Sequence, residues 1–288
     1  MAFQKITLIG VGLLGGSLGL AIKQRGLASR VEGYVRREAS VAECQKFGVL
    51  DSATRDLQKA VQGADLIIFC TPLSQMRTLA ENFLPFLKEG ALVTDVGSVK
   101  ASVMRDLEDL VASRKADFVG GHPMAGGEKT GVSAARTDLF QDAVCILTPT
   151  PRTPKQALLR LETFWESVGA RVLKMSPEAH DDLVSRSSHL PHVVAAELAN
   201  YVLSPVHPKE QGMVCANGFR DTTRIASGSP EMWRDISLAN RQNLARVLGV
   251  FIEDLQEFRL ALEKGDEKAV SEFFEKAKQR RDDWKSKF

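Results

Sequence analysis

The chain of 288 residues has 44% hydrophobic and 26% charged residues and a formal net charge of +2 at pH 7. This composition is that of an ordinary globular protein long enough for two domains, and the small net charge argues against a nucleic-acid or membrane surface. The four cysteines lie far apart and form no CxxC pair, so we expect reduced thiols in a cytoplasmic protein and predict no metal site.

The first predicted elements are a strand, a glycine-rich turn and a helix. Residues 6–9 form an apolar run, residues 10–15 read Gly-Val-Gly-Leu-Leu-Gly, and residues 16–22 continue without a charge. In a dinucleotide-binding turn the first glycine allows the tight turn, the second lets a pyrophosphate approach the backbone, and the third lets helix and strand pack closely. A secretory signal is the alternative, but only Lys5 precedes the run and no cleavage site follows it. The predicted cofactor-binding residues here are Gly10, Gly12, Leu13, Leu14 and Gly15.

Short apolar runs separated by amphipathic stretches continue through the first half of the chain. They predict strands over residues 6–9, 31–35, 66–70, 92–96, 118–121 and 144–147. Strands that alternate with helices, such as those predicted over 76–87 and 99–113, indicate parallel pairing through right-handed crossovers. We therefore expect an α/β Rossmann-type doubly wound parallel sheet. A helix near 155–168 and a strand over 170–175 complete this domain, which is predicted to span residues 1–176.

The second half, residues 177–288, is predicted to be an all-helical domain, with helices over 178–203, 231–262 and 267–285. The middle helix carries a heptad pattern with spacings of 4, 3, 4, 3 and 4, and Gly265 is its expected C-cap. The heptad residues are Leu244, Leu248, Phe251, Leu255, Phe258 and Leu262. The pattern favours a homodimer through the helical domain, and packing within one chain is the alternative.

The end of the second predicted strand bears on the choice of cofactor. NAD sites have an Asp or Glu there, about 20 residues past the glycines, which binds the ribose 2′-hydroxyl. Val35 occupies this position and Arg36 and Arg37 follow it, so the 2′-phosphate of NADP is favoured, because arginine pairs well with phosphate. A solvated surface turn is the alternative reading of the two arginines, and Glu38 keeps NAD use open. Thr71 and Pro72, after the strand over 66–70, complete the predicted cofactor-binding set.

Two motifs of the first domain are candidates for the chemistry. Ser98 follows the strand over 92–96, where ligands of an open α/β sheet bind, so it is expected to face the nicotinamide, to cap the next helix, or both. His122 lies among glycines directly after a predicted strand and is expected to be exposed. An imidazole there suits the acceptance of a proton from an alcohol undergoing oxidation.

Two motifs of the helical half add polar side chains. Residues 188–192 read Ser-His-Leu-Pro-His, which puts His189 and His192 on one helix face, and Pro191 is expected to kink or loosen that helix. Arg220 and Arg224 are spaced to bind carboxylates, or to pair with Asp221 in a structural role.

Together these motifs resemble the prephenate/arogenate dehydrogenase family of tyrosine biosynthesis. The resemblance rests on residues 10–17, 95–100, 122–126, 188–192, 218–226 and 232–236 and covers nearly the whole chain. It implies a nucleotide-binding domain joined to a helical dimerisation domain. It also implies an oxidative decarboxylation, in which hydride leaves ring carbon C4 for the nicotinamide, CO2 is lost and the ring becomes aromatic.

The resemblance also implies roles for individual residues. His122 is similar to the histidine that takes the proton of the C4 hydroxyl, and Ser98 to the serine that orients it. Arg224 is similar to the arginine that binds a substrate carboxylate. The remaining residues implied at the substrate site are His192, Glu128, Asp221 and Trp233.

Rival functions remain at this stage. A hydroxyacid or 6-phosphogluconate-type dehydrogenase also joins a Rossmann domain to helices but usually relies on a lysine base. A cofactor-binding redox sensor without enzymatic activity is the second rival, and it leaves His122 and Arg224 unexplained. Within the resembling family, His192 favours prephenate over arogenate as the substrate.

Overall fold

The computed structural model describes residues 3–127 and 129–287 and divides the chain into two compact units, Met1–Asn240 and Arg241–Phe288. The first unit holds the two sheets and the helices up to Asn240, and the second holds two long helices. The predicted domain boundary between residues 176 and 177 falls inside the first unit and stays a prediction.

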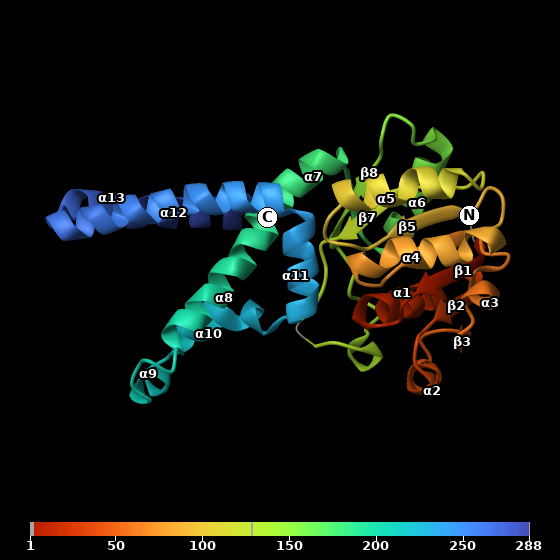
Figure 1. Cartoon of the computed structure of the whole chain (residues 1–288), viewed down its shortest axis with the longest axis horizontal. Coiled ribbons are helices and arrows are strands. Elements are labelled where there is room, and N and C mark those ends of the chain that lie inside the picture. Colours follow the sequence, from red (N-terminus) through yellow and green to blue (C-terminus); the bar gives the residue numbers. More distant parts are fainter. Residues whose placement is uncertain (1–2, 128, 288) are drawn as a thin grey trace. The chain divides into compact units, whose positions relative to one another are not determined.

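A six-stranded sheet with strand order β3-β2-β1-β4-β5-β6 forms the centre of the first unit (Figure 1). Every pair of neighbours in it is parallel, as predicted for a doubly wound fold. Its strands are β1 (Phe3–Ile9), β2 (Ala28–Tyr34), β3 (Ser52–Thr54), β4 (Leu66–Phe69), β5 (Leu92–Asp95) and β6 (Asp117–Phe118).

Helices cover both faces of this sheet, so its central strands are buried on both sides. On one face, α1 (Leu13–Gln24) and α6 (Lys155–Val168) share a core with Ile6 and Leu8 of β1. On the other, α4 (Leu73–Phe83) and α5 (Ala101–Ala112) lie side by side over Ile9 (Figure 1). Burial on both faces explains why these strands read as continuous apolar runs.

A second, three-stranded sheet has the order β7-β8-β9. Its strands are β7 (Gly120–Pro123), β8 (Val144–Thr148) and β9 (Arg171–Lys174), and β7 runs antiparallel to β8. The single parallel strand predicted over 118–121 is therefore wrong: β6 ends at Phe118 in the first sheet and β7 begins at Gly120 in the second. No crossover helix separates them, so the chain cannot return parallel to the same sheet.

A buried ion pair holds β7 against the end of β5. The fully buried Lys100 Nζ forms a short hydrogen bond to Asp95 Oδ2 and donates to the carbonyl oxygen of Gly121 at 2.9 Å. The Gly121 N–H donates to Asp95 Oδ1 at 3.2 Å. Both backbone groups of Gly121 are thus bound by this pair, which fixes the strand that carries His122.

Two short elements at the open edge of the large sheet were not predicted from the sequence. They are α2 (Glu38–Lys46) and β3. The strand has three residues with no buried side chain, so it lacks the apolar run that marks a strand. A short helix α3 (Leu57–Val61) follows it. Elsewhere in the unit, one 3₁₀ turn (Leu84–Phe86) follows α4 and another (Val132–Ala134) lies between β7 and β8.

The rest of the first unit is helical, as predicted, but its helices are interrupted. The predicted helix over 178–203 consists of α7 (Pro177–Val184), a π-helical turn (Ser185–His189) and α8 (Leu190–Val202). This confirms the loosened hydrogen bonding expected from Pro191, which has no N–H to donate. The further elements are α9 (Glu210–Met213), α10 (Asn217–Thr223), a 3₁₀ turn (Arg224–Ser227) and α11 (Pro230–Ala239).

The second unit consists of α12 (Arg241–Lys264) and α13 (Glu267–Lys287). Gly265 ends α12 with φ +64°, and the N–H of Asp266 donates to the carbonyl of Ala261, so the predicted C-cap is confirmed. Phe258 packs on Phe273 and Phe274 of α13, which uses part of the heptad pattern within the chain. Among the described residues no helix has both the length and the apolar character needed to cross a membrane.

Candidate active site

The glycine-rich turn has the geometry expected of a pyrophosphate-binding loop. Gly10 has φ +94°, which favours glycine, and a Cβ on Gly15 would overlap the carbonyl oxygen of Gly10. Gly12 differs, since a Cβ there would meet no atom within 4 Å. Helix α1 begins at Leu13 without a side-chain cap, so its first N–H groups are available to an anion.

The other predicted cofactor residues are placed around this turn. A Cβ on Gly10 would lie 2.7 Å from the methyl carbon of Thr71, so Thr71 packs on the turn, and Pro72 precedes the first residue of α4. Leu13 and Leu14 form the half-buried first turn of α1. The residues present fit a dinucleotide, with open space at Gly12 and an uncapped helix next to it.

The end of β2 presents arginine to solvent. Val35 is buried in the core of the unit, whereas Arg36 and Arg37 are exposed. The Glu38 carboxylate lies 3.6 Å from Arg55, whose Nε also donates to the carbonyl of Arg36. Because Val35 points inward, the side chains available to a ribose from this segment are those of the two arginines and Glu38.

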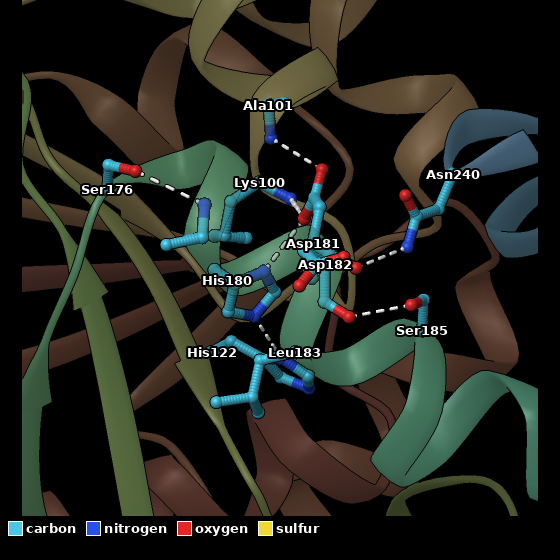
Figure 2. A network of polar contacts seen from close by, with 12 residues as sticks. Lys100, Ala101, His122, Ser176, His180, Asp181, Asp182, Leu183, Ser185 and Asn240 are labelled. Carbon is cyan, nitrogen blue, oxygen red and sulfur yellow. Dashed lines mark hydrogen bonds and ion pairs between the residues drawn. The ribbon is translucent and has the colours of Figure 1, made fainter. Parts of the chain in front are cut away.

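His122 lies on β7 and is buried, with 6% of its surface exposed, so the expectation that it is exposed is wrong. Its Nδ1 lies 2.8 Å from Nε2 of His180, and Nδ1 of His180 lies 2.8 Å from Oδ1 of Asp181 (Figure 2). The sequence analysis missed this arrangement, because the partner residues are in α7, 58 positions further along the chain.

Burial keeps the histidines of this cluster uncharged. Desolvation, helped by repulsion from His180 and Lys100, lowers the pKa of His122 well below its usual range. Burial also lowers the pKa of His180, although the hydrogen bond to Asp181 opposes that shift. For His189, burial lowers the pKa to about 4, although the nearby Asp181 carboxylate and the Ser98 backbone oppose that shift. At neutral pH each imidazole therefore has one protonated and one basic nitrogen.

The predicted N-cap role of Ser98 is wrong. Helix α5 begins at Ala101, and the carboxylate of Asp181 accepts from the N–H groups of Lys100 at 2.7 Å and Ala101 at 2.9 Å (Figure 2). Ser98 is half-buried in the turn after β5, at the carboxyl end of the parallel sheet. Its backbone opposes the lowering of the His189 pKa. Its hydroxyl is thus not needed to cap the helix.

A cavity of about 500 Å³ lies between α8 and the segment from Ile225 to Ser237. The ring of His192 stacks on Trp233 with centroids 3.7 Å apart, and both line this cavity. His192 donates from Nδ1 to the carbonyl of Ser188 at 3.0 Å, which leaves Nε2 as an acceptor. The structure therefore brings two of the predicted substrate residues together at one hollow.

The remaining predicted substrate residues do not line this cavity in the part of the chain that the structure describes. Arg224 is exposed and begins the 3₁₀ turn whose next residues, Ile225 and Ala226, line the cavity. Asp221 is exposed on α10. Glu128 lies outside the described residues.

Sequence reasoning also missed the residues that support the site, namely Asp95, Lys100, His180, Asp181 and Asn240. Asn240 donates to the carbonyl oxygen of Asp181 at 2.8 Å and its side-chain nitrogen lies 3.1 Å from Nδ1 of His189. Asp95 and Lys100 begin and end a motif that the sequence analysis singled out, but burial of a lysine has no local sequence signal. His180 and Asp181 stand in an ordinary amphipathic helix.

Two models of one protein family match the two halves of the chain. The family model described as the nucleotide-binding domain of prephenate dehydrogenase matches residues 18–174, and the model of its dimerization domain matches residues 176–277.

Relatives of known name agree with these matches. The chain is 38% identical to the prephenate dehydrogenase of Bacillus subtilis over 96% of this chain and 75% of that protein. It is 37% identical to the cyclohexadienyl dehydrogenase of Zymomonas mobilis over 97% of this chain and 95% of that protein. Among solved structures, the prephenate dehydrogenase of A. aeolicus in complex with hydroxyphenyl propionate and NAD+ superimposes with a TM-score of 0.91. It is 33% identical and the match covers 98% of this chain and 99% of that chain.

The glycine turn yields a paired prediction. Gly12→Ala should leave the fold unchanged but weaken dinucleotide binding at least tenfold, because the added methyl group fills only the space left open to a ligand. Gly15→Ala should instead lower the melting temperature, because its methyl group would overlap backbone. Binding is measured by quenching of tryptophan fluorescence and stability by calorimetry. Unchanged dinucleotide affinity in a folded Gly12→Ala variant would contradict the proposed position of the pyrophosphate.

Proposed function

The chain belongs to the prephenate dehydrogenase family, and we propose that it catalyses the oxidative decarboxylation of prephenate with a nicotinamide dinucleotide, in tyrosine biosynthesis. The observation that carries the proposal is the state of His122, a buried neutral imidazole whose Nδ1 is engaged by His180. Its other nitrogen, Nε2, is the basic atom that oxidation of an alcohol requires.

The division of labour follows from the chemistry of the substrate. A bound nicotinamide would accept the hydride from ring carbon C4. Nε2 of His122 takes the proton of the C4 hydroxyl, and the bond to the ring carboxylate breaks as its electrons enter the ring. Because aromatisation drives the loss of CO2, the protein needs only to position the ring and accept one proton.

The other residues are proposed to bind and orient the reactants. Arg224 pairs with a substrate carboxylate, since a guanidinium offers the planar pair of donors that a carboxylate accepts. His192 and Trp233 line the substrate cavity, and Ser98 orients His122 and the nicotinamide. Resemblance to the family implies Asp221 and Glu128 as acidic residues of the substrate site, and Glu128 lies outside the described residues.

The preferred substrate is proposed to be prephenate rather than arogenate. The two differ in a side-chain keto or amino group, and Nε2 of His192 is the nitrogen available to that end of the ligand. A solved relative named as an arogenate dehydrogenase, from Synechocystis, is 28% identical with a TM-score of 0.79, so both substrates belong in the assay. The comparison of kcat/KM for prephenate and arogenate decides between them, with 6-phosphogluconate as the substrate of the rival class.

The enzyme binds a nicotinamide cofactor, and we propose that it prefers NADP over NAD. The support is the pair of exposed arginines after β2 and the inward orientation of Val35. The Glu38 carboxylate is drawn toward Arg55, which reduces its availability to a ribose hydroxyl.

Two chains are proposed to associate as a homodimer through the helical half, whose family model is that of a dimerization domain. Within the second unit Leu255 and Leu262 of the heptad are 46% and 54% exposed, and Phe274 is 59% exposed. Apolar side chains of this number on one helical hairpin are typical of a surface covered by a partner.

His122→Asn should abolish turnover while substrate and cofactor still bind. The asparagine amide retains a donor where Nδ1 of His122 meets His180 but has no basic nitrogen in place of Nε2. Loss of a general base costs about 10²–10⁴-fold in rate, measured here as kcat from cofactor absorbance at 340 nm. A kcat near that of the wild type would remove His122 from the mechanism.

Cofactor choice should respond to the end of β2. The wild type should have a lower KM for NADP than for NAD, and the double variant Arg36→Asp/Arg37→Ala should reverse that order, because it replaces the two exposed arginines with a carboxylate that a ribose hydroxyl can reach. The change should appear in KM rather than kcat, because the 2′ position is remote from the hydride. Arg30→Ala, near the start of β2 and away from the proposed cofactor site, serves as the control and should leave both KM values unchanged. A wild type that uses NAD as well as NADP would overturn the proposed preference.

Charge placed in the exposed heptad positions should separate the dimer. Leu255→Glu/Leu262→Glu should sediment as a 31.6 kDa monomer with the helix content of the wild type, because neither side chain is buried within its own chain. Gln256→Glu adds a charge one residue away and should remain dimeric. A wild-type protein that sediments as a monomer at micromolar concentration would refute the proposal.

A further inference from the structure

His180 and Asp181 form a buried polar pair next to His122, and neither residue contacts the reacting atoms in the proposed chemistry. Their side chains are almost fully buried, as is His122. Buried polar groups are costly unless paired, so a linked set of three in one place requires a reason. We propose that His180 and Asp181 are positioning residues that hold the proton of His122 on Nδ1, so that Nε2 faces the reaction as the base. The inference rests on the proposed function of His122.

Asp181 is the fixed end of the hydrogen-bonded series formed by His122, His180 and Asp181. Its two carboxylate oxygens accept the N–H groups of Lys100 and Ala101 at the start of α5, and its own carbonyl accepts from Asn240 (Figure 2). Three elements therefore restrain this residue. The positive end of the α5 dipole, where these two N–H groups lie, stabilises negative charge on the acceptor.

The proton positions follow from this carboxylate. An ionised carboxylate only accepts, so Nδ1–H of His180 must donate to Oδ1 of Asp181 across 2.8 Å. Neutral His180 then has a bare Nε2, which can only accept. The 2.8 Å contact from His122 must consequently be a hydrogen bond donated by its Nδ1–H. Neutral His122 is left with its lone pair on Nε2.

The opposite arrangement, with the proton of His122 on Nε2 and a bare Nδ1, is disfavoured. It requires either a protonated Asp181 or a doubly protonated His180, and both meet resistance. The two backbone N–H groups at Asp181 would lose a charged acceptor in the first case. In the second, burial opposes charge on His180, whose pKa is lowered. A wrong tautomer at the base is costly, as the rate loss of about 10⁴-fold for the equivalent change in serine proteases illustrates.

The direct test is the tautomer of His122 in the folded enzyme. The chain has five histidines, so 15N-histidine labelling gives few signals, and long-range 1H–15N correlation spectra distinguish protonated from bare ring nitrogens. Spectra of His122→Asn and His180→Gln assign the two rings. We expect Nδ1–H and bare Nε2 for His122. A protonated Nε2 in the wild type overturns the inference whatever substrate the enzyme uses.

Asp181→Asn should reverse the direction of the hydrogen bonds that link Asp181, His180 and His122 without removing them. Its amide oxygen can accept a backbone N–H of α5, and its NH2 group can donate to Nδ1 of His180, which puts the proton of His180 on Nε2 and that of His122 also on Nε2. We expect kcat to fall roughly 10²-fold or more while KM for prephenate and for the cofactor changes less than threefold. The spectra should show the exchanged tautomer. A folded variant with kcat within threefold of the wild type overturns the inference.

A second pair of variants covers the case in which Asp181→Asn fails to fold. His180→Gln keeps an acceptor oxygen where Nε2 of His180 meets His122, whereas His180→Leu has none. The glutamine variant should retain at least a tenth of kcat and the leucine variant less than a hundredth, with equal KM values. Equal kcat in the two variants overturns the inference. His207→Gln, on a histidine remote from the cavity and the histidine chain, is the control and should match the wild type.

Failure of the proposed function can be told apart from failure of this inference. If the wild type oxidises neither prephenate nor arogenate, the role of His180 and Asp181 in turnover falls with the proposed function. The spectra of the wild type and of Asp181→Asn still decide the tautomer, because they need no substrate.

Discussion

The buried ion pair of Lys100 and Asp95 is the interaction on which the site depends. Its ammonium group binds the carboxylate at the end of β5 and the carbonyl of Gly121 on β7, while the N–H of Lys100 donates to Asp181 of α7. One residue thus joins the parallel sheet, the second sheet and the first helix of the helical half. Loss of one partner of such a pair leaves an uncompensated buried charge, which typically costs about 3–5 kcal/mol.

The ion pair of Lys100 and Asp95 aligns two sheets that share no strand pairing. β7 belongs to a different sheet from β5, so no strand ladder aligns His122 with the carboxyl ends of the parallel strands. Asp95 and Lys100 replace that ladder by binding both backbone groups of Gly121. His122 is therefore positioned by side chains, and Lys100 also connects this part of the structure to α7.

The buried environment also sets the chemistry of the histidines. Desolvation lowers the pKa of His122, His180 and His189, so they act as neutral hydrogen-bonding groups rather than as cations. A base that is uncharged at neutral pH can accept a proton, and its partners decide which nitrogen does so. Position and protonation are thus controlled by one network rather than by His122 alone.

The sequence by itself determined the strand, glycine turn and helix predicted over residues 6–22, the doubly wound sheet and the helical character of the second half. These features are encoded locally, in glycine positions, apolar runs and helical periodicity, and the order of the motifs identified the family. The sequence also singled out His122 and His192, whose neighbours in the chain are distinctive. Only the tertiary structure decided that β7 leaves the parallel sheet, that Asp181 rather than Ser98 caps α5, and that His180 contacts His122. Each of these depends on contacts between residues 21 or more positions apart, or on burial of a charged side chain, and neither leaves a pattern in the local sequence.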